Sequence, residues 1–405
     1  MIMKKILKRT IAALCCVCTI LTSGIACRKP NDQSSELDAS GETFESKWID
    51  GIDAVFDESL GYSDENPSVI QIGSTRYLYY TKNQSKYSSE TCIAVRKGTF
   101  GGGKWNYGAP KICLDVSENG WDSAHVFGAD VVRGNFGFNG ATYSYLMAYS
   151  GNSGKGNKKN ASIGFAVSNE PDGKWIRTGS YPVVKFESSE FDRTGLLEYD
   201  GAIEPSLISF DKNGKIWMFY SEYETFKSNY VLEMDVSDAG NVKIFNKKVL
   251  ETSGIRDLGI TNPLLYGGDF VWDKESGDFI AVRECSVTAT VEPKISDELQ
   301  IVRCSDEVLT EHKQEWTGRE EFVEEWWHAI GNKIDVDSTA NYDTDKTGYS
   351  RLFSPCIVSD CYGRLLEYGK LEIMFTSKAT STDERAETDE TWKFTGMIHT
   401  LSVTY

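Results

Sequence analysis

Five polar residues stand at the start of short apolar stretches, and their side chains are well placed to do chemistry. They are Asn66, Asp130, Glu204, Asn262 and Ser354. A carboxylate can take up or release a proton, whereas amides and hydroxyls donate and accept hydrogen bonds without a change of charge. The set therefore indicates a polar site that combines proton transfer with the binding of a hydroxyl-rich ligand.

The stretch 202–222 shows most clearly which elements position these residues. Glu204-Pro205 leads into an expected strand at 206–210, which is followed by Asn213-Gly214 and a second strand at 215–221. Asn-Gly between two apolar runs is a strong hairpin signal, and Pro at the first position of a strand removes no ladder donor. This stretch is therefore predicted to be a hairpin whose first strand begins at a carboxylate.

A similar phrase begins near each of the other four polar residues: a strand, a Gly-containing turn and an aromatic or β-branched strand. A strand-based unit that recurs along a chain is typical of a propeller. We therefore predict an all-β fold, a five-bladed β-propeller; a β-sandwich is the alternative. The first strand of each blade lines the central channel, so the five residues are expected to converge at its mouth.

The amino terminus has the composition of a targeting segment. Residues 1–27 combine a basic head, an apolar run and small residues before Cys27, an arrangement that resembles a bacterial lipobox. We predict a signal peptide with lipidation at Cys27, a disordered polar tether at 28–47 and the propeller at 48–405. The protein is then expected at the cell surface; ordinary cleavage and secretion is the alternative.

The composition limits the partners. The formal net charge of −17 argues against nucleic acid or anionic lipid as a partner, and is compatible with a neutral carbohydrate. After the signal peptide no apolar run is long enough to span a membrane, so contact with a membrane is expected only through the lipid anchor. No cofactor and no metal site is predicted, because the cysteine spacings do not resemble a zinc site.

Three further expectations concern the framework. Cys92 with Cys113, and Cys285 with Cys304, would each suit a disulfide between neighbouring strands, although buried free thiols are equally compatible with the sequence. Residues 319–330 are the best helix candidate, since their aromatic residues recur on one face. The last strand, 392–405, is expected to close the propeller, with residues 48–56 as a possible partner.

The repeated phrases resemble those of five-bladed propeller glycoside hydrolases, especially family 43, over most of the predicted mature chain. In that family the corresponding phrases carry the general base, a carboxylate that tunes the pKa of the acid, and the general acid. The phrases in this sequence that carry the resemblance are Asn66-Pro67-Ser68-Val69, Phe127-Gly128-Ala129-Asp130-Val131, Ile203-Glu204-Pro205-Ser206-Leu207 and Thr261-Asn262-Pro263.

The catalytic roles do not transfer directly. Asn66 stands at the position of the base and Asn262 near that of the acid, and an amide cannot exchange a proton at a useful pKa. We therefore predict Asp64 as the base and Glu284 as the acid. Glu204, with Asp130, would position the substrate and set the pKa of the acid.

Other side chains are assigned to substrate binding. Asn66, Asn262 and Arg351 would contact sugar hydroxyls at the mouth. Trp121 would stack on a sugar ring and His125 would line the channel, although packing between blades or a buried hydrogen bond is the more ordinary role for each.

Three functions follow from this pattern. The first is hydrolysis of an oligo- or polysaccharide by paired carboxylates. The second is a non-catalytic glycan-binding propeller, which the two Asn substitutions would suit. The third is a purely structural propeller. Carboxylates gathered at the channel mouth would favour the enzyme, whereas a mouth of amides and aromatic rings would favour the binder.

Overall fold

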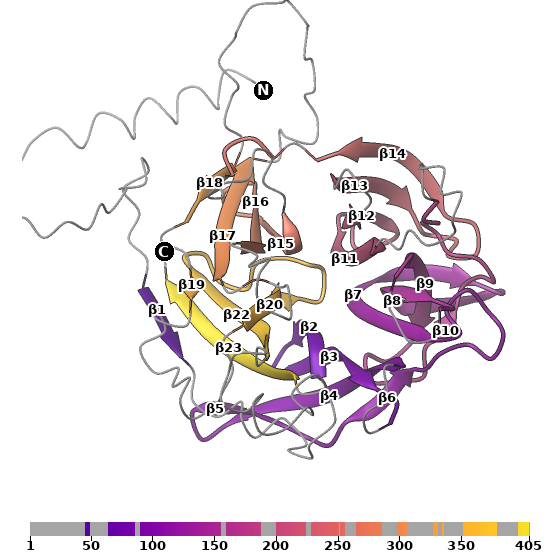
Figure 1. Ribbon diagram of the computed structural model, residues 1–405, viewed down its shortest axis with the longest axis horizontal. Coiled ribbons are helices and arrows are strands. Elements are labelled where there is room, and N and C mark those ends of the chain that lie inside the picture. Colours follow the sequence, from indigo (N-terminus) through magenta and orange to yellow (C-terminus); the bar gives the residue numbers. More distant parts are fainter. Residues whose placement is uncertain are drawn as a thin grey trace, which may run out of the picture. The chain divides into compact units, whose positions relative to one another are not determined.

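The computed structural model of this chain is built from β-strands, and the part of the chain that it describes contains no helix (Figure 1). Within the same residues, no segment has the length and apolar character of a membrane-spanning helix. The description covers residues 64–85, 90–154, 159–187, 200–223, 228–250, 252–255, 265–285, 296, 298–305, 327–330, 334–335, 351–378 and 396–404, and the backbone of 45–48.

The strands form successive antiparallel meanders. In chain order they are β1 (Glu45–Trp48), β2 (Asp64–Ile72), β3 (Thr75–Asn83), β4 (Thr91–Gly101), β5 (Lys104–Tyr107), β6 (Lys111–Leu114), β7 (His125–Phe138), β8 (Ala141–Asn152), β9 (Ser162–Ser168), β10 (Ile176–Arg177), β11 (Gly201–Ser209), β12 (Lys215–Tyr223), β13 (Ser228–Asp235), β14 (Lys243–Val249), β15 (Tyr266–Asp273), β16 (Asp278–Cys285), β17 (Glu298–Ser305), β18 (Trp327–Ala329), β19 (Ile334–Asp335), β20 (Arg351–Ile357), β21 (Ser359–Asp360), β22 (Lys370–Lys378) and β23 (Gly396–Thr404).

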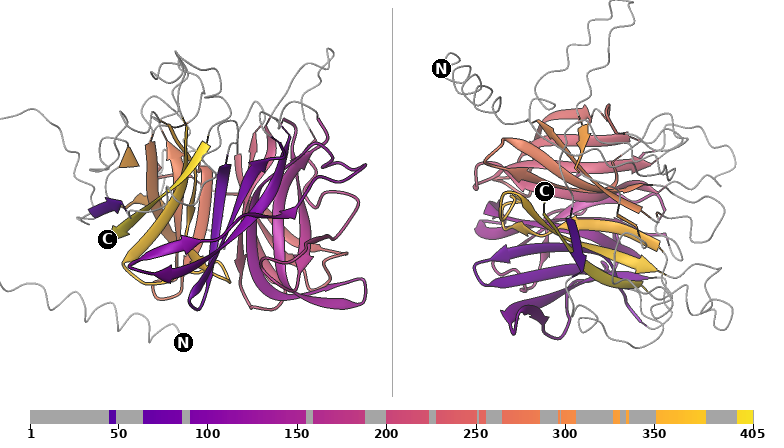
Figure 2. Two further views of the ribbon diagram at one scale, coloured as in Figure 1. Left: turned by 90° about the horizontal axis from the view of Figure 1, so that it is seen from below. Right: turned by 90° about the vertical axis from the view of Figure 1, so that its left-hand side faces the viewer.

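Each meander begins with one strand near the centre of the molecule (Figure 1). These inner strands are β2, β7, β11, β15 and β20. Each of them contacts the inner strand before it and the one after it, and β20 contacts β2, so that the contacts run in a ring. Seen from the side, the strands of each meander run between the two faces of the molecule (Figure 2). The ring brings residues together that lie far apart in the sequence.

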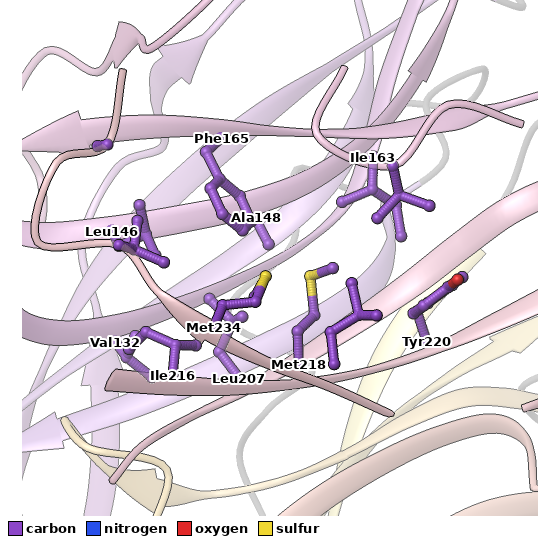
Figure 3. Close-up of a cluster of buried hydrophobic side chains, with 14 of the residues drawn as sticks. Val132, Leu146, Ala148, Ile163, Phe165, Leu207, Ile216, Met218, Tyr220 and Met234 are labelled. Carbon is purple, nitrogen blue, oxygen red and sulfur yellow. The ribbon is translucent and has the colours of Figure 1, made fainter. Parts of the chain in front are cut away.

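The central strands of the meanders are buried on both faces, which explains their nearly continuous apolar sequences. In β12, Ile216, Met218 and Tyr220 face the core shared with the preceding meander, where they meet side chains such as Val132 and Leu146 (Figure 3). The intervening Phe219 points into the core shared with the following meander. Alternation along one strand therefore packs two neighbouring sheets at once.

The amino-terminal segment completes the last meander. β1 pairs antiparallel with β23, outside β22 and β20. Closure of the fold by the two ends of the chain was expected, but the pairing begins at Glu45, within the stretch predicted as tether. Of the segment 48–56 proposed for this role, only Trp48 belongs to β1, and residues 49–63 lie outside the described part.

The expectations for a helix at 319–330 and for the cysteines can be compared with the structure. The helix predicted at 319–330 is wrong at its carboxyl end, because residues 327–329 form β18 and pair with β17. Pairing with the sheet overrides the local periodicity there; residues 319–326 lie outside the described part. All six cysteines from Cys92 onward are buried thiols outside any disulfide, which is the alternative that the sequence left open.

Residues 358–365, which we call the plug segment, cross the end of the inner ring. β21 pairs in parallel with Ile70 and Gln71 of β2. Carbonyl groups of the plug segment also accept hydrogen bonds from the backbone N–H groups of Arg133, Ser209 and Trp272. These contacts reach four inner strands near their carboxyl ends. The plug segment therefore links the strands at the end opposite their first residues.

Candidate active site

Every inner strand is interrupted by a bulge close to its first residue. At these points the pairing with the second strand shifts register, and one residue adopts a positive φ. The residues are Asn66 (φ 52°), Gly128 (54°), Glu204 (58°), Gly267 (57°) and Ser354 (45°). Gly and Asn tolerate this conformation, whereas it is strained for Glu and Ser. Such strain is frequent at functional sites.

The bulges surround a small central cavity of about 40 Å³. Three consecutive residues of each inner strand line it: Asn66, Pro67 and Ser68; Gly128, Ala129 and Asp130; Glu204, Pro205 and Ser206; Gly267, Gly268 and Asp269; and Ser354, Pro355 and Cys356. Four of the five polar residues singled out in the sequence therefore converge, as expected.

The backbone N–H group of each bulge requires an acceptor. In three inner strands the acceptor is a hydroxyl on the second strand of the preceding meander. The N–H of Asn66 donates to Thr376 Oγ1 at 3.1 Å, that of Gly128 to Thr81 Oγ1 at 3.0 Å, and that of Glu204 to Ser150 Oγ at 3.3 Å. Short hydroxyl side chains thus serve this structural role.

Glu284 occupies the corresponding position on the second strand of the fourth meander. It lies opposite Tyr266 in register, and its Oε1 accepts the N–H of Ser354 at 2.7 Å. The N–H of Gly267 donates instead to Glu204 Oε2 at 3.1 Å. Two carboxyl groups therefore lie beside Gly267. At the bulges of Asn66, Gly128 and Glu204, the acceptors of the backbone N–H groups are hydroxyls instead.

Gly267 is required by this arrangement. A Cβ at this position would lie 2.5 Å from Glu284 Oε1, closer than any real contact, and the φ of 57° adds strain for any other residue. The absence of a side chain at Gly267 therefore makes room for the Glu284 carboxyl group.

Burial, followed by the negative charge of Glu284 and a smaller contribution from Asp200, raises the pKa of Glu204 to about 8. Hydrogen bonds from the Gly267 N–H and the Tyr223 hydroxyl oppose the shift. The carboxyl group thus keeps its proton at neutral pH while it lines the cavity, which is the state that a general acid needs.

Asp130 links three inner strands. Its Oδ1 accepts the Ser68 hydroxyl of β2 at 2.7 Å, and its Oδ2 accepts the Leu207 N–H of β11 at 2.6 Å. Burial raises its pKa to about 6. Both oxygens are engaged in contacts between sheets, so that the residue assigned to substrate binding also holds the ring together.

Asp269 of β15 makes the same kind of contacts two inner strands further along the ring. Its Oδ1 accepts the Ser206 hydroxyl at 2.7 Å, and its Oδ2 accepts the Ile357 N–H at 2.7 Å. Burial, followed by the charge of Asp130, raises its pKa to about 7. Sequence reasoning missed Asp269, although the Gly267-Gly268-Asp269 phrase parallels Gly128-Ala129-Asp130.

Asn66 and Ser354 meet where the first and last meanders adjoin. The Asn66 side-chain amide donates to Ser354 Oγ at 2.7 Å. This bond uses one amide N–H and one lone pair of the hydroxyl. The amide oxygen of Asn66 and the hydroxyl proton of Ser354 are then available to a ligand in the cavity.

The two other catalytic candidates do not line the cavity. Asp64, at the first residue of β2, is 2% exposed, and its Oδ1 lies 3.3 Å from Lys82 Nζ. Glu284 is 3% exposed and reaches the site through its contacts with Ser354 and Gly267.

Three residues assigned to substrate binding lie away from the cavity. Trp121 stacks on Tyr149, with ring centroids 5.6 Å apart, so it packs against the protein as the more ordinary role of this residue predicts. His125 is fully buried, and its Nδ1 lies 3.5 Å from Thr91 Oγ1. Arg351 is 5% exposed at the first residue of β20.

Asn262 and Cys27 lie outside the described residues. In the fourth inner strand, the residue equivalent to Asn66 and Glu204 is Gly267 and not Asn262. An Asn-Pro pair also occurs in ordinary turns, whereas the bulge is identified only by its register with β16. Among the residues that the structure describes, no group of His, Cys, Asp and Glu is arranged to hold a metal ion.

Comparison with solved structures finds the same fold at low sequence identity. A family 117 glycoside hydrolase from the marine bacterium Zobellia galactanivorans aligns with a TM-score of 0.53 and 13% identity over 90% of each chain. An α-L-arabinofuranosidase from Podospora anserina, in complex with cellotriose, gives 0.51 and 10% over 90% of this chain and 97% of that chain. No protein-family model and no curated protein matches the sequence.

A third similar structure is the catalytic domain of a family 62 α-L-arabinofuranosidase from Coprinopsis cinerea, with a TM-score of 0.50 and 9% identity over 90% of this chain and 96% of that chain. At identities this low, the likeness shows the fold. The chain has the all-β propeller fold of these glycoside hydrolases, and the resemblance found in the sequence is confirmed at that level.

Proposed function

We propose that this protein is a glycoside hydrolase and that its five meanders are the blades of a five-bladed propeller, with the reaction in the central cavity. The observation that carries the proposal is Glu204, a carboxyl group that lines the cavity and whose pKa of about 8 keeps it protonated at neutral pH. The fold shared with glycoside hydrolases supports the same function, although fold alone does not assign one.

In this scheme Glu204 is the general acid and protonates the oxygen of the leaving group. Glu284 acts through Glu204, since its charge raises the pKa of the acid. These roles are exchanged relative to those expected from the sequence, because Glu204 lines the cavity and Glu284 does not. The chemistry itself, proton donation to a glycosidic oxygen by a carboxylic acid, is unchanged.

Asp64 remains the proposed base, and because it does not line the cavity either, the attacking water would have to reach it past Asn66. Its ion pair with Lys82 suits a carboxylate that must be ionised to accept a proton from water. It precedes the bulge at Asn66, on the side of the ring away from β11. An inverting reaction would place acid and base about 6.5–9.5 Å apart with a water between them.

A panel of nitrophenyl glycosides and oligosaccharides tests the proposal with the Glu204→Gln variant. We expect wild-type turnover, and a loss of about 100- to 10,000-fold in the variant on substrates with poor leaving groups. On dinitrophenyl glycosides, whose leaving groups need little protonation, the loss should be much smaller. That dependence on the leaving group identifies an acid, since general damage to the site would lower both rates equally.

Asp64→Asn provides the matched test of the base, and its loss should be independent of the leaving group. Glu367→Gln, which changes an exposed carboxylate paired with Lys370, is the control for the neutral substitution. Absence of turnover on every substrate, together with saturable oligosaccharide binding in calorimetry, would instead make the protein a glycan binder.

We further propose that the protein acts at the cell surface, with Cys27 carrying a lipid. The small residues before Cys27 support this proposal. Cys27→Ala should release the protein from the membrane fraction and abolish labelling with a fatty-acid analogue. Unchanged membrane association of this variant would contradict it.

A further inference from the structure

The face of the molecule opposite the bulges exposes large apolar side chains. Phe210, in the turn after β11, is 45% exposed, and Leu366 and Tyr368, in the turn before β22, are 41% and 56% exposed. The two turns adjoin, because Arg364 Nη2 donates a hydrogen bond to the Phe210 carbonyl at 3.2 Å. We call residues 210–214 and 358–370 together the plug face. Exposed apolar side chains that gather in one place mark a contact site.

The exposed side chains of the plug face are held by packed aromatic rings and backbone hydrogen bonds. The Phe210 ring lies 4.6 Å from that of Trp217 and 6.3 Å from that of Trp272, centroid to centroid. The Arg364 guanidinium lies 5.4 Å from the centre of the Trp272 ring, and the Leu365 N–H donates to the Trp272 carbonyl. Because this framework is already fixed, a partner that binds it meets little cost of ordering side chains.

The plug face is electrically neutral, in a chain whose formal net charge is −17. Its acidic and basic residues are equal in number: Asp211, Asp360 and Glu367 against Lys212, Arg364 and Lys370. Both Asp side chains accept N–H groups of their own turns, and Glu367 pairs with Lys370. Lys212 Nζ lies 4.7 Å from the centre of the Tyr362 ring, and the Arg364 guanidinium 5.7 Å from it. Aromatic rings beside long basic side chains suit the boundary between water and a bilayer.

The chain enters the fold at this same end. Glu45, the first residue of β1, pairs with Thr404, and Thr404 pairs with Lys370, the first residue of β22. Residues 28–44 join Glu45 to Cys27, and an unstructured chain of that length spans about 25 Å on average. A nine-residue inner strand such as β2 is longer, at about 30 Å. A lipid on Cys27 would therefore hold the plug face nearer to the bilayer than the bulges.

We infer that the plug face rests on the membrane surface, with Phe210, Leu366 and Tyr368 inserted between the lipid headgroups and the acyl chains. The inference rests on the proposed lipidation of Cys27, and it goes beyond the expectation of contact through the lipid alone. A lipidated protein is held more firmly when a second contact with the bilayer supports the acyl group. The bulges and the proposed site then face away from the membrane, toward substrates outside the cell.

Fluorescent labels at the two ends of the inner ring test the orientation. Ser74→Cys places a label in the turn between β2 and β3, at the plug end, and Ser153→Cys places one directly after β8, at the end of the bulges. Both serines are exposed, whereas the cysteines from Cys92 onward are buried and should not react. The lipidated protein is reconstituted in phosphatidylcholine vesicles that carry a nitroxide on the headgroup. We expect the label at residue 74 to be quenched severalfold more strongly than the label at residue 153.

The double variant Leu366→Ser/Tyr368→Ser tests the apolar contact itself. Its matched control is Ile112→Ser/Tyr181→Ser, which removes an exposed aliphatic side chain and an exposed tyrosine outside the plug face. The plug-face variant should make the quenching of the two labels equal, and the control should leave the difference in place. For the unlipidated Cys27→Ala protein, partition onto phosphatidylcholine vesicles should fall at least about tenfold in the plug-face variant and stay unchanged in the control.

The outcomes separate this inference from the lipidation proposal. Equal quenching of both labels in the lipidated wild type would overturn the inference and leave lipidation intact. If Cys27 carries no lipid, partition of the unlipidated protein still decides: binding that depends on Leu366 and Tyr368 supports the contact, and absence of binding overturns it. A dimer in vesicle-free solution that the plug-face variant dissociates would assign this face to a second copy of the chain, and would overturn the inference as well.

Discussion

The neighbourhood of Glu204 explains how one carboxyl group can act as an acid at neutral pH. Burial alone disfavours its charged form, and Glu284 adds a negative charge that further disfavours ionisation. Three of the other meanders use a hydroxyl where Glu284 stands, so that the same backbone contact is made there without a charge. The substitution of a carboxylate for a hydroxyl therefore costs the fold nothing in backbone hydrogen bonding, but changes the electrostatics of the cavity.

Glu284→Gln should shift the pH profile of activity. Without the negative charge the pKa of Glu204 falls, so the acid loses its proton at lower pH. The basic limb of the kcat profile is expected to move toward acid by about one pH unit. Ser221→Ala, at the equivalent position of the third meander, is the control, and it should leave the limb in place. A basic limb that does not move in Glu284→Gln would show that Glu284 does not set the pKa of the general acid.

At the scale of the element, the bulges are the feature that turns five ordinary strands into a site. Each bulge lets the inner strand direct three consecutive residues toward the cavity, which a regular strand with alternating side chains cannot do. The strained residues Glu204 and Ser354 are held by side chains of neighbouring strands, so that the ring as a whole stabilises them.

Gly267→Ala should be markedly destabilising. The new Cβ would lie 2.5 Å from Glu284 Oε1 in a backbone of positive φ. Gly277→Ala is the matched control, because its φ of 79° is equally unsuited to Ala but no atom lies within 4 Å. We expect a loss of about 1 kcal/mol for Gly277→Ala and at least about 2 kcal/mol more for Gly267→Ala, measured by denaturant unfolding. Equal losses would mean that the contact with Glu284 is unimportant.

At the scale of the whole molecule, the first and last meanders must be held together for the ring to close. Arg76 of β3 and Glu372 of β22 form a bidentate ion pair, with Nη2 and Oε2 2.6 Å apart. The Arg76 guanidinium also lies 4.0 Å from the centre of the Trp105 ring. Asn66 and Ser354 meet at the same junction, toward the other end of these strands.

Removal of one partner of this ion pair should weaken the whole fold. Glu372→Gln leaves a largely buried guanidinium without its counter-charge, and we expect a loss of about 3 kcal/mol in the free energy of unfolding. Glu367→Gln breaks the exposed pair with Lys370 and should cost less than about 0.5 kcal/mol. Similar small losses for both variants would show that the junction does not depend on the Arg76 ion pair.

The stability of the molecule should depend on pH through its central carboxyl groups. Burial raises the pKa of Asp130 to about 6, of Asp269 to about 7 and of Glu204 to about 8, so the folded state binds more protons than the unfolded state. Stability is then greatest near pH 4 and falls as pH rises to about 8. We expect Tm to decrease by on the order of 5 °C between pH 5 and pH 8.5.

Asp269→Asn should flatten this pH dependence, because the amide does not titrate. The variant loses acceptor capacity toward the Ser206 hydroxyl or the Ile357 N–H, and is expected to be less stable than wild type at pH 5. At pH 8.5 the difference should narrow. A Tm that rises with pH in the wild type would contradict the assignment of raised pKa values to this group.

Much of the architecture could be predicted from the sequence, because hairpins and turns are local. The Pro that follows Asn66, Glu204 and Ser354 marks three of the bulges, and Gly128 precedes the predicted Asp130. The prediction failed at the fourth inner strand, where Asn262-Pro263 resembles the other phrases more closely than Gly267 does. Local periodicity also predicted a helix where Trp327 pairs in a sheet.

By itself the sequence determined the all-β class, the convergence of the inner strands and the identity of most polar groups around the cavity. Only the tertiary structure decided the roles of those groups. Glu284 reaches the site through its register with Tyr266 and its contact with the next meander, and Asp269 joins it through Ser206 and Ile357. Register and contacts between sheets are non-local, and burial, which sets the pKa of each carboxyl group, exists only in the folded chain.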